Sequence, residues 1–223
     1  MDEVSMRIGI TMRVIENAEY NERRDALSRE WSEYLSRILP GVILIPFLNN
    51  ADKVEDTIKS LDIKGIILSN GNDWGESRER DETEQRIVNY CKTINLPILG
   101  VCRGMQVLNI IFGGKVERDL DGISKGNHVD VEHEVLIENS PFLKLSKREL
   151  IGVNSFHKQG VLIKGLARDM KTFALTADGV VEGIFHKTLP IVAIQWHPER
   201  KSPSAVFDQQ LIIRLFKENR FWD

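Results

Sequence analysis

A thiol flanked by glycines, Cys102 in the sequence G-V-C-R-G, is the residue of this chain best suited to covalent chemistry. The apolar residues 96–101 before it predict a buried strand, and residues 105–112 after it predict a helix. A thiol at such a sharp turn has the geometry of a nucleophile elbow. The helix N-terminus lowers the pKa of the thiol and leaves backbone N–H groups free to bind an anion. The glycine pattern by itself fits a buried, inert cysteine equally well.

A base for this thiol is found near the C-terminus, where the apolar residues 191–196 end at His197-Pro198-Glu199. Pro198 keeps the preceding histidine extended, so His197 projects from the end of the predicted strand. A carboxylate at Glu199 would bind the Nδ1–H of the imidazole and stabilise its charged form. A lone histidine more often caps or fills a core. Together with Cys102 and Glu199, however, the pattern favours a Cys-His-Glu triad.

Alternating strand-like and helix-like segments must bring these residues together, because they are about a hundred positions apart. Strands are predicted at residues 6–12, 42–46, 65–69 and 96–101, with a β-rich segment at 132–195. Helices are predicted at residues 27–38, 54–61, 83–94, 105–112 and 205–216. This alternation is typical of an α/β protein with a mostly parallel central sheet and helices on both faces, in three layers.

The ends of the predicted strands locate the site. In such sheets ligands bind outside the carboxyl ends of the strands. Residues 69–73, Cys102 and His197 all follow strand ends. We therefore expect three separate segments to meet in one cleft.

Composition excludes several other classes of protein. The 223 residues suit one α/β domain, and the formal charge of −3 comes without a basic block of the kind that binds nucleic acid. No apolar run reaches the ~18 residues of a membrane span, and the first residues are too polar for a signal peptide. Of the two cysteines, Cys91 fits the apolar face of a helix. We expect a reduced, cytoplasmic protein without disulfides.

A second polar pattern, His128, Asp130, Glu132 and Glu134, alternates with valines and could form a metal site. An exposed strand face explains the same alternation, and the ligand spacing is not tight. The sequence therefore predicts no metal and no cofactor.

Taken together, the motifs resemble those of the class I glutamine amidotransferase-like superfamily, in which G-x-C-x-G-x-Q and a late H-P-E carry the triad. The branch that the chain resembles is the γ-glutamyl hydrolases of the peptidase C26 type, including the γ-glutamyl-γ-aminobutyrate hydrolases. Residues 66–73 resemble the oxyanion-strand motif, residues 153–159 the N-S-x-H-x-Q segment and residues 177–183 the D-G-V-V-E motif. The resemblance implies one flavodoxin-like domain over residues 1–223.

The resemblance also implies a mechanism. Cys102 would attack a γ-glutamyl amide to form a γ-glutamyl thioester. His197 would move the protons, and Glu199 would orient His197. The oxyanion would be held by the backbone N–H groups of Gly71 and Arg103. Residues implied to bind the glutamyl group are Gln106, Asn154, Ser155, Phe156, His157 and Glu182, the last through the α-amino group.

Two positions depart from the family pattern. Asn70 stands where the oxyanion motif commonly has its first glycine, and Lys158 stands where many relatives have a second histidine. Asparagine is the residue other than glycine that best tolerates a positive φ, so we expect the loop to keep its shape. Lys158 bears on the identity of the substrate more than on the chemistry, because no triad position is changed.

The identity of the substrate and its partners stays open at this stage. A polar cluster follows the first strand, and we hypothesise that it binds the part of a small γ-glutamyl substrate beyond the scissile amide, such as a phosphate- or nucleotide-bearing amine. Its members are Arg13, Asn17, Tyr20, Arg23 and Arg24. The alternatives are a glutaminase subunit that supplies ammonia to a separate synthetase, and a non-catalytic small-molecule binding module. A homodimer is compatible with the sequence.

Overall fold

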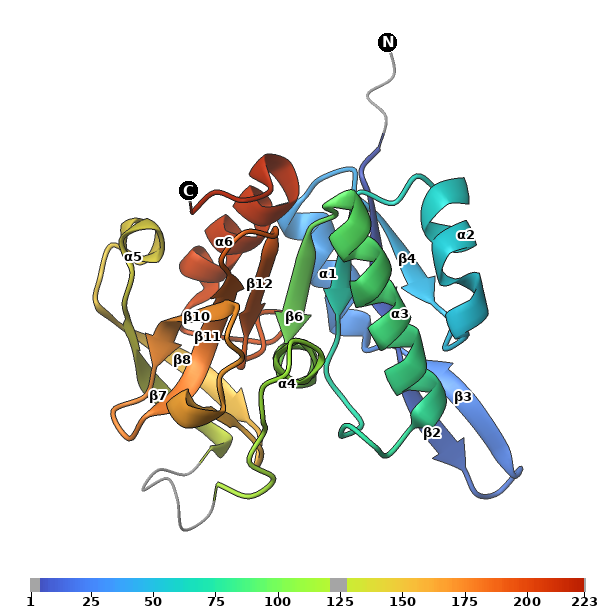
Figure 1. The fold of residues 1–223 in the computed structure, drawn as a ribbon, viewed down its shortest axis with the longest axis horizontal. Coiled ribbons are helices and arrows are strands. Elements are labelled where there is room, and N and C mark those ends of the chain that lie inside the picture. The colour runs from blue at the N-terminus through green and yellow to red at the C-terminus, as the bar shows by residue number, and fades with distance from the viewer. Residues whose placement is uncertain (1–4, 121–127, 223) are drawn as a thin grey trace.

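Parallel strands form the part of the sheet that carries the elbow. The computed structural model describes residues 5–120 and 128–222. Five strands run parallel in the order β4-β1-β5-β6-β12 within the described residues. These strands are β1 (Arg7–Thr11), β4 (Ile43–Phe47), β5 (Gly65–Leu68), β6 (Ile98–Val101) and β12 (Ile191–Ile194). In Figure 1, β4 and β6 point toward the same lower edge of the molecule. The predicted α/β sheet is confirmed.

Antiparallel strands continue the sheet beyond β12, where the sequence indicated only a β-rich segment. The order is β12-β11-β10-β7-β8, with β9 paired to β11. The strands are β7 (Val129–Ile137), β8 (Leu150–Phe156), β9 (Val161–Leu162), β10 (Met170–Leu175) and β11 (Val180–His186). A short helix, α5 (Ser140–Ser146), interrupts this segment, and its αL residue Lys147 ends it. A short 3-10 turn, η2 (Ile163–Gly165), follows β9.

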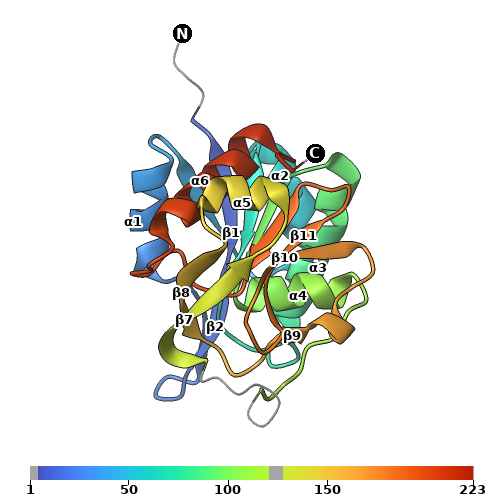
Figure 2. The same ribbon diagram turned by 90° about the vertical axis from the view of Figure 1, so that its left-hand side faces the viewer.

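Helices cover both faces of the parallel strands, as the three-layer prediction requires. One apolar cluster joins a face of the sheet to α1 (Arg29–Ile38), α5 and α6 (Ala205–Glu218). The other joins the opposite face to α2 (Val54–Ser60), α3 (Arg78–Ile94) and α4 (Arg103–Ile111), with a 3-10 turn, η1 (Ala51–Lys53), before α2. Figure 2 shows α1 on one side of β1 and α3 on the other. Alternate residues of a strand serve the two clusters: Ile67 faces the first, while Ile66 and Leu68 face the second.

Two elements differ from the sequence prediction. Residues 13–26 form an exposed hairpin, β2 (Arg13–Asn17) with β3 (Glu22–Ala26), which lies at the lower edge in Figure 1. Its charged strands lack the alternating apolar pattern that identifies a half-buried strand. Helix α3 begins at Arg78 rather than near residue 83. Its first turns are stabilised by buried ion pairs rather than by an apolar stripe, so hydrophobic periodicity did not reveal them.

Candidate active site

Cys102 lies at a strained turn between β6 and α4, so the predicted elbow is present. Its φ of 53° and ψ of −108° fall in a region that residues other than glycine rarely adopt. Its backbone N–H donates to the carbonyl of Ile194 at 2.8 Å, which ties the turn to β12. The glycine two residues later is required by a close approach: a Cβ on Gly104 would lie 2.0 Å from the carbonyl oxygen of Leu68.

His197 and Glu199 pair directly beyond the end of β12. The Nδ1 of His197 lies 2.8 Å from Oε1 of Glu199, and both side chains are buried. Asn154 on β8 fixes the histidine backbone, accepting from its N–H at 2.8 Å and donating to its carbonyl at 2.9 Å. Among the described residues, Nε2 of His197 has no hydrogen-bond partner. The ring is therefore oriented by Glu199 and Asn154, with its other nitrogen available to Cys102.

Opposite charges on Cys102 and His197 stabilise each other. Burial alone would raise the pKa of the Cys102 thiol, but the charge of His197, with a smaller contribution from His157, outweighs burial and lowers it. Burial alone would lower the pKa of His197, but the Cys102 thiolate and Glu199 raise it to about 9. Each charge thus favours the other, and such a thiolate-imidazolium pair is what nucleophilic catalysis by cysteine requires.

This pairing makes a testable prediction about alkylation. In His197→Ala the thiolate loses its counter-charge, so the pKa of Cys102 rises toward or above the ordinary thiol value. The rate of alkylation by iodoacetamide at pH 7 should then fall about 10-fold or more, because an unperturbed thiol is only a few per cent ionised there. Intact-protein mass spectrometry from pH 5 to 9 measures it.

Cys91 provides an internal control for the same experiment. It is 1% exposed, and burial raises its pKa to about 12, so it should stay unmodified in both proteins. Equal rates at Cys102 in wild type and in His197→Ala would contradict the pairing.

Gly71 and Arg103 are the two residues expected to donate backbone N–H groups to an oxyanion. Gly71, after β5, has a φ of +110°, and a Cβ there would lie 2.8 Å from Nε of Arg13. Asn70 is not among the residues with positive φ, so the loop places its strained position at Gly71 and Asn70 needs no special tolerance. The second N–H belongs to Arg103, the first residue of α4, where helical N–H groups lack intrahelical partners. Both residues line the same cavity.

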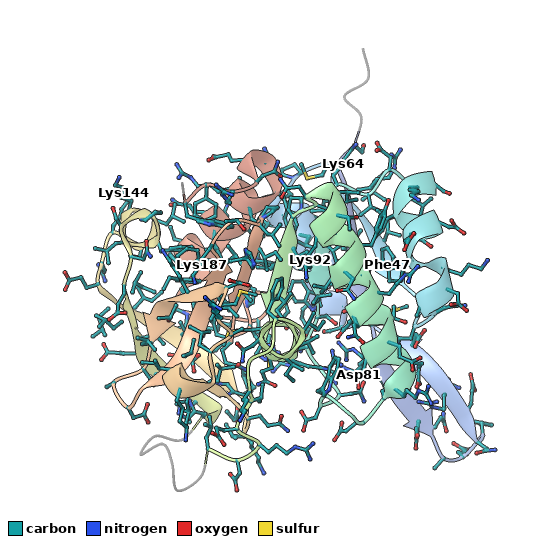
Figure 3. The ribbon with its side chains drawn as sticks, in the orientation of Figure 1. Phe47, Lys64, Asp81, Lys92, Lys144 and Lys187 are labelled. Carbon is teal, nitrogen blue, oxygen red and sulfur yellow. The ribbon has the colours of Figure 1, made fainter. Side chains whose placement is uncertain are left out.

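A buried ion network positions both of these segments. Glu84 on α3 accepts from Arg80 at 3.1 Å and also from Arg103, whose guanidinium binds Asp81 at 2.5 Å. Arg80 in turn donates to the carbonyl oxygens of Ser69 at 2.9 Å and of residue 70 at 3.1 Å. Figure 3 labels Asp81, near the N-terminal end of α3. The loop after β5 and the start of α4 are therefore held by one carboxylate. Sequence reasoning missed this network, because Arg and Glu four residues apart are usual on exposed helices.

These segments surround a cavity of about 410 Å³. Gln106 lines it and is connected to Cys102 through the buried Gln195: Gln106 donates to Oε1 of Gln195 at 3.3 Å, and Gln195 donates to the Cys102 sulfur at 3.6 Å. Gln195 was not among the predicted site residues, although it lies only two positions before His197, in the segment that follows β12. The lining residues are Arg13, Asn70, Gly71, Asp73, Cys102, Arg103, Gln106, Arg118, Phe156, His157, Lys158, Gln159, His197 and Arg200.

The predicted glutamyl-binding residues divide into two groups. Gln106, Phe156 and His157 line the cavity. Asn154, Ser155 and Glu182 do not; they are buried behind it. Asn154 holds the backbone of His197, and Ser155 donates to the carbonyl of His128 at 2.7 Å.

The two arginines hypothesised to bind phosphate also lie away from the cavity lining. Arg23 and Arg24 are exposed on β3, where Arg23 pairs with Glu79 and Arg24 pairs with Glu22 at 2.8 Å. Of the arginines in the hairpin, only Arg13, the first residue of β2, lines the cavity. Two further arginines that line the cavity, Arg118 and Arg200, come from segments that the sequence did not assign to the site.

Comparison with known proteins places this arrangement in a family. Residues 7–199 match the model of the Peptidase C26 family. The chain belongs to this family. The C26 domain is also 30% identical over 204 residues to the γ-glutamyl-CDP-amidate hydrolase of Campylobacter jejuni, a match that covers 88% of this chain and 92% of that protein. The chain is a cysteine-dependent amide hydrolase, so the alternative of a non-catalytic binding module is not supported.

Other relatives of this C26 protein include amidotransferases. It is 34% identical over 171 residues to the candidate glutamine amidotransferase PB2B2.05 of Schizosaccharomyces pombe, a match that spans 66% of this chain and 64% of that protein. The glutaminase domain of Trypanosoma brucei CTPS with bound acivicin has the same fold, with a TM-score of 0.70 at 18% identity over 98% of this chain and 96% of that one. Within the described residues, no helix is both long and apolar enough to cross a bilayer.

Proposed function

We propose that this protein hydrolyses the γ-glutamyl amide bond of a small conjugate whose leaving amine carries phosphate. The charge of the side chains that line the cavity is the observation that supports this class of substrate. One carboxylate, Asp73, lines it. Besides Arg103, whose charge is matched by Asp81 and Glu84, four arginine and lysine side chains line it, of which Arg200 also lies 3.9 Å from Glu199. The four are Arg13, Arg118, Lys158 and Arg200.

The proposed reaction has two halves. The Cys102 thiolate attacks the γ-carbonyl, and the N–H groups of Gly71 and Arg103 stabilise the oxyanion. His197, charged at the outset, donates its proton to the departing nitrogen, leaving a γ-glutamyl thioester and a free amine. Neutral His197 then removes a proton from water as the water attacks the thioester. Glutamate leaves and the thiolate-imidazolium pair is restored, so Cys102, His197 and Glu199 act as a triad.

The cations explain a preference for an anionic leaving group. Arg118 and Lys158 are exposed at the mouth of the cavity, and Arg200 lies over the Phe156 ring at 4.4 Å. Guanidinium and ammonium groups bind phosphate oxygens through charge-assisted hydrogen bonds. The Campylobacter relative, named as acting on a γ-glutamyl-CDP-amidate, supports a nucleoside diphosphate amidate as the first conjugate to test.

Substrate comparison with one variant tests this proposal. Wild type should hydrolyse a γ-glutamyl nucleoside diphosphate amidate with a kcat/KM well above that for an uncharged γ-glutamyl anilide. Arg118→Ala should raise KM for the charged conjugate about 10-fold, the loss of one charge-assisted contact, and leave the anilide kinetics within about twofold. Glutamate release measures both reactions.

A cation far from the cavity serves as the matched control. Lys144 is exposed on α5, at the upper left in Figure 3, and α5 contributes no residue to the cavity lining, so Lys144→Ala should change neither reaction. Equal kcat/KM for the two substrates in wild type, or equal losses on both in Arg118→Ala, would contradict an anionic leaving group.

A glutaminase role in a two-protein enzyme is the second candidate, and the relatives give it support. The chain is 33% identical over 144 residues to one of the subunits of glutamine-hydrolysing GMP synthase from Pyrococcus furiosus, covering 65% of this chain and 70% of that protein. In that case glutamine would be the substrate, and ammonia would pass to a synthetase partner. Glutaminase activity that stays low in the isolated chain and rises sharply with a synthetase partner would favour this function.

A further inference from the structure

Three histidines and a carboxylate converge behind the cavity, at a place the reaction does not use. His128 precedes β7, His133 lies on β7, His157 follows β8 and Glu182 lies on β11. One potential ligand atom from each lies within 4.8 Å of every other. The carboxylate oxygens of Glu182 are 3.4 Å from Nε2 of His157, 3.9 Å from Nδ1 of His128 and 4.0 Å from Nε2 of His133.

An ionised Glu182 would need a positive charge that no lysine or arginine of the described residues supplies. Its side chain is fully buried, and among the described residues neither of its oxygens accepts a hydrogen bond. The ion-pair partners found for it there are these three histidines alone. An ionised carboxylate removed from water is very unfavourable unless it is paired or coordinates a metal ion. The cation must therefore come from protonated imidazole or from a metal held by the imidazoles.

The orientation of His157 favours the metal. Its Nδ1 lies 2.9 Å from the carbonyl oxygen of Gln159, and a carbonyl accepts, so this nitrogen carries a proton. In the neutral ring Nε2 then presents a lone pair toward Glu182, itself an acceptor. Two facing acceptors repel each other unless a cation lies between them. A histidine whose second nitrogen donates to a backbone carbonyl is the usual arrangement of a metal ligand.

We propose that His128, His133, His157 and Glu182 bind one divalent transition-metal ion, with Zn²⁺ the ion that suits them best. Imidazole and carboxylate are ligands of Zn²⁺, and tetrahedral bonds of about 2.0–2.1 Å place ligand atoms roughly 3.4 Å apart. The His157–Glu182 separation already has this value. The distances from Glu182 to the other two histidines must each close by about half an ångström, and ligand atoms that are up to 4.8 Å apart must approach further.

A site with four protein ligands is closed, which is typical of a structural metal. This one would join β7, the end of β8 and β11, which are not all neighbours in the sheet. It would also fix His157, which lines the cavity beside Cys102. The sequence prediction of no metal treated His128, Asp130, Glu132 and Glu134 as one exposed strand face; the three carboxylates are exposed, but His128 is buried. The ligand set instead joins His128 and His133 to His157 and Glu182, distant residues that strand spacing does not reveal.

Metal analysis of the full chain tests the proposal. The measurements use Cys102→Ser, so that the active-site thiolate cannot be the metal ligand. Mass spectrometry of the elements should find about one zinc per chain after expression in zinc-supplemented medium. Removal by a chelator should lower Tm by about 5 °C or more, and adding ZnCl₂ alone should restore it.

Two carboxylate variants in the same background locate the site. Glu182→Gln should lose the bound zinc, whereas Glu132→Gln, an exposed position on β7, should retain it. Absence of stoichiometric zinc in natively folded Cys102→Ser, with no uptake at micromolar ZnCl₂, would overturn the proposal and leave protonated histidine to neutralise Glu182. Equal loss of zinc in both carboxylate variants would also overturn it. If Glu182→Gln does not fold, the zinc content and uptake of Cys102→Ser still decide.

Discussion

Replacement of Cys102 by alanine should lower kcat by about 10⁴-fold or more while leaving the fold intact. Without the sulfur no thioester can form, and the residual rate comes from substrate binding and the oxyanion site. Stability should change little, because Cys102 is only partly buried and alanine must adopt the same positive φ. Steady-state glutamate release and thermal unfolding measure the two effects.

A second thiol provides the control for this experiment. Cys91 packs in the apolar cluster between α3 and the sheet, away from the cavity. Cys91→Ala should lose some stability and keep kcat within about twofold, the reverse of the Cys102 result. A glutamine-like electrophile should label wild type and Cys91→Ala once, and Cys102→Ala not at all. Turnover retained in Cys102→Ala would contradict covalent catalysis by this residue.

Replacement of Glu84 by glutamine should destabilise the protein by about 3–5 kcal/mol, the largest effect on stability that we expect. Burial alone would raise the pKa of Glu84, but Arg103 and Arg80 outweigh burial and lower it, so the carboxylate is charged. With glutamine in its place, the buried guanidiniums of Arg80 and Arg103 lose the negative charge of Glu84. Urea denaturation measures the change in the free energy of unfolding.

The same substitution should also reduce activity in the fraction that stays folded. Arg80 holds the carbonyls at the end of β5, and Arg103 opens α4, so the N–H groups of Gly71 and Arg103 both depend on Glu84. Misplacing one oxyanion donor costs about 10²–10³ in kcat. Assay at low temperature, where the variant remains folded, separates this effect from unfolding.

Glu82 on the same helix is a matched control. It is exposed and pairs with Arg78 at 2.6 Å, one turn apart. An exposed pair of this kind contributes at most about 0.5 kcal/mol, so Glu82→Gln should change neither stability nor kcat noticeably. Similar losses of stability and kcat in Glu84→Gln and Glu82→Gln would show that the buried network does not position the loop after β5 and the start of α4.

The order and type of most elements followed from the sequence because local patterns encode them. The apolar run before Cys102, the glycines around it and the helix after it all agree with the elbow. Pro198 keeps His197 extended whatever the rest of the chain does, and Glu199 is close enough in sequence to reach its ring. Strands that end in polar residues then place Gly71, Cys102 and His197 at one edge of a parallel sheet.

The remainder depended on contacts between residues far apart in sequence, which no local pattern contains. The hairpin at residues 13–26 carries Arg23 and Arg24 away from the cavity, and the loops around Arg118 and Lys158 bring other cations to it. The buried α3 network looks like an exposed helix surface until the fold encloses it.

What the sequence determined by itself was the class of enzyme, a cysteine-dependent amide hydrolase, and the local geometry at Cys102, His197 and Glu199, because short segments encode that backbone geometry. Only the tertiary structure decided what surrounds them: which cations line the cavity, and that Glu182 is buried among three histidines rather than open to substrate. The physical reason is that charge and burial are properties of the assembled fold. A side chain acquires them from neighbours that arrive from other strands.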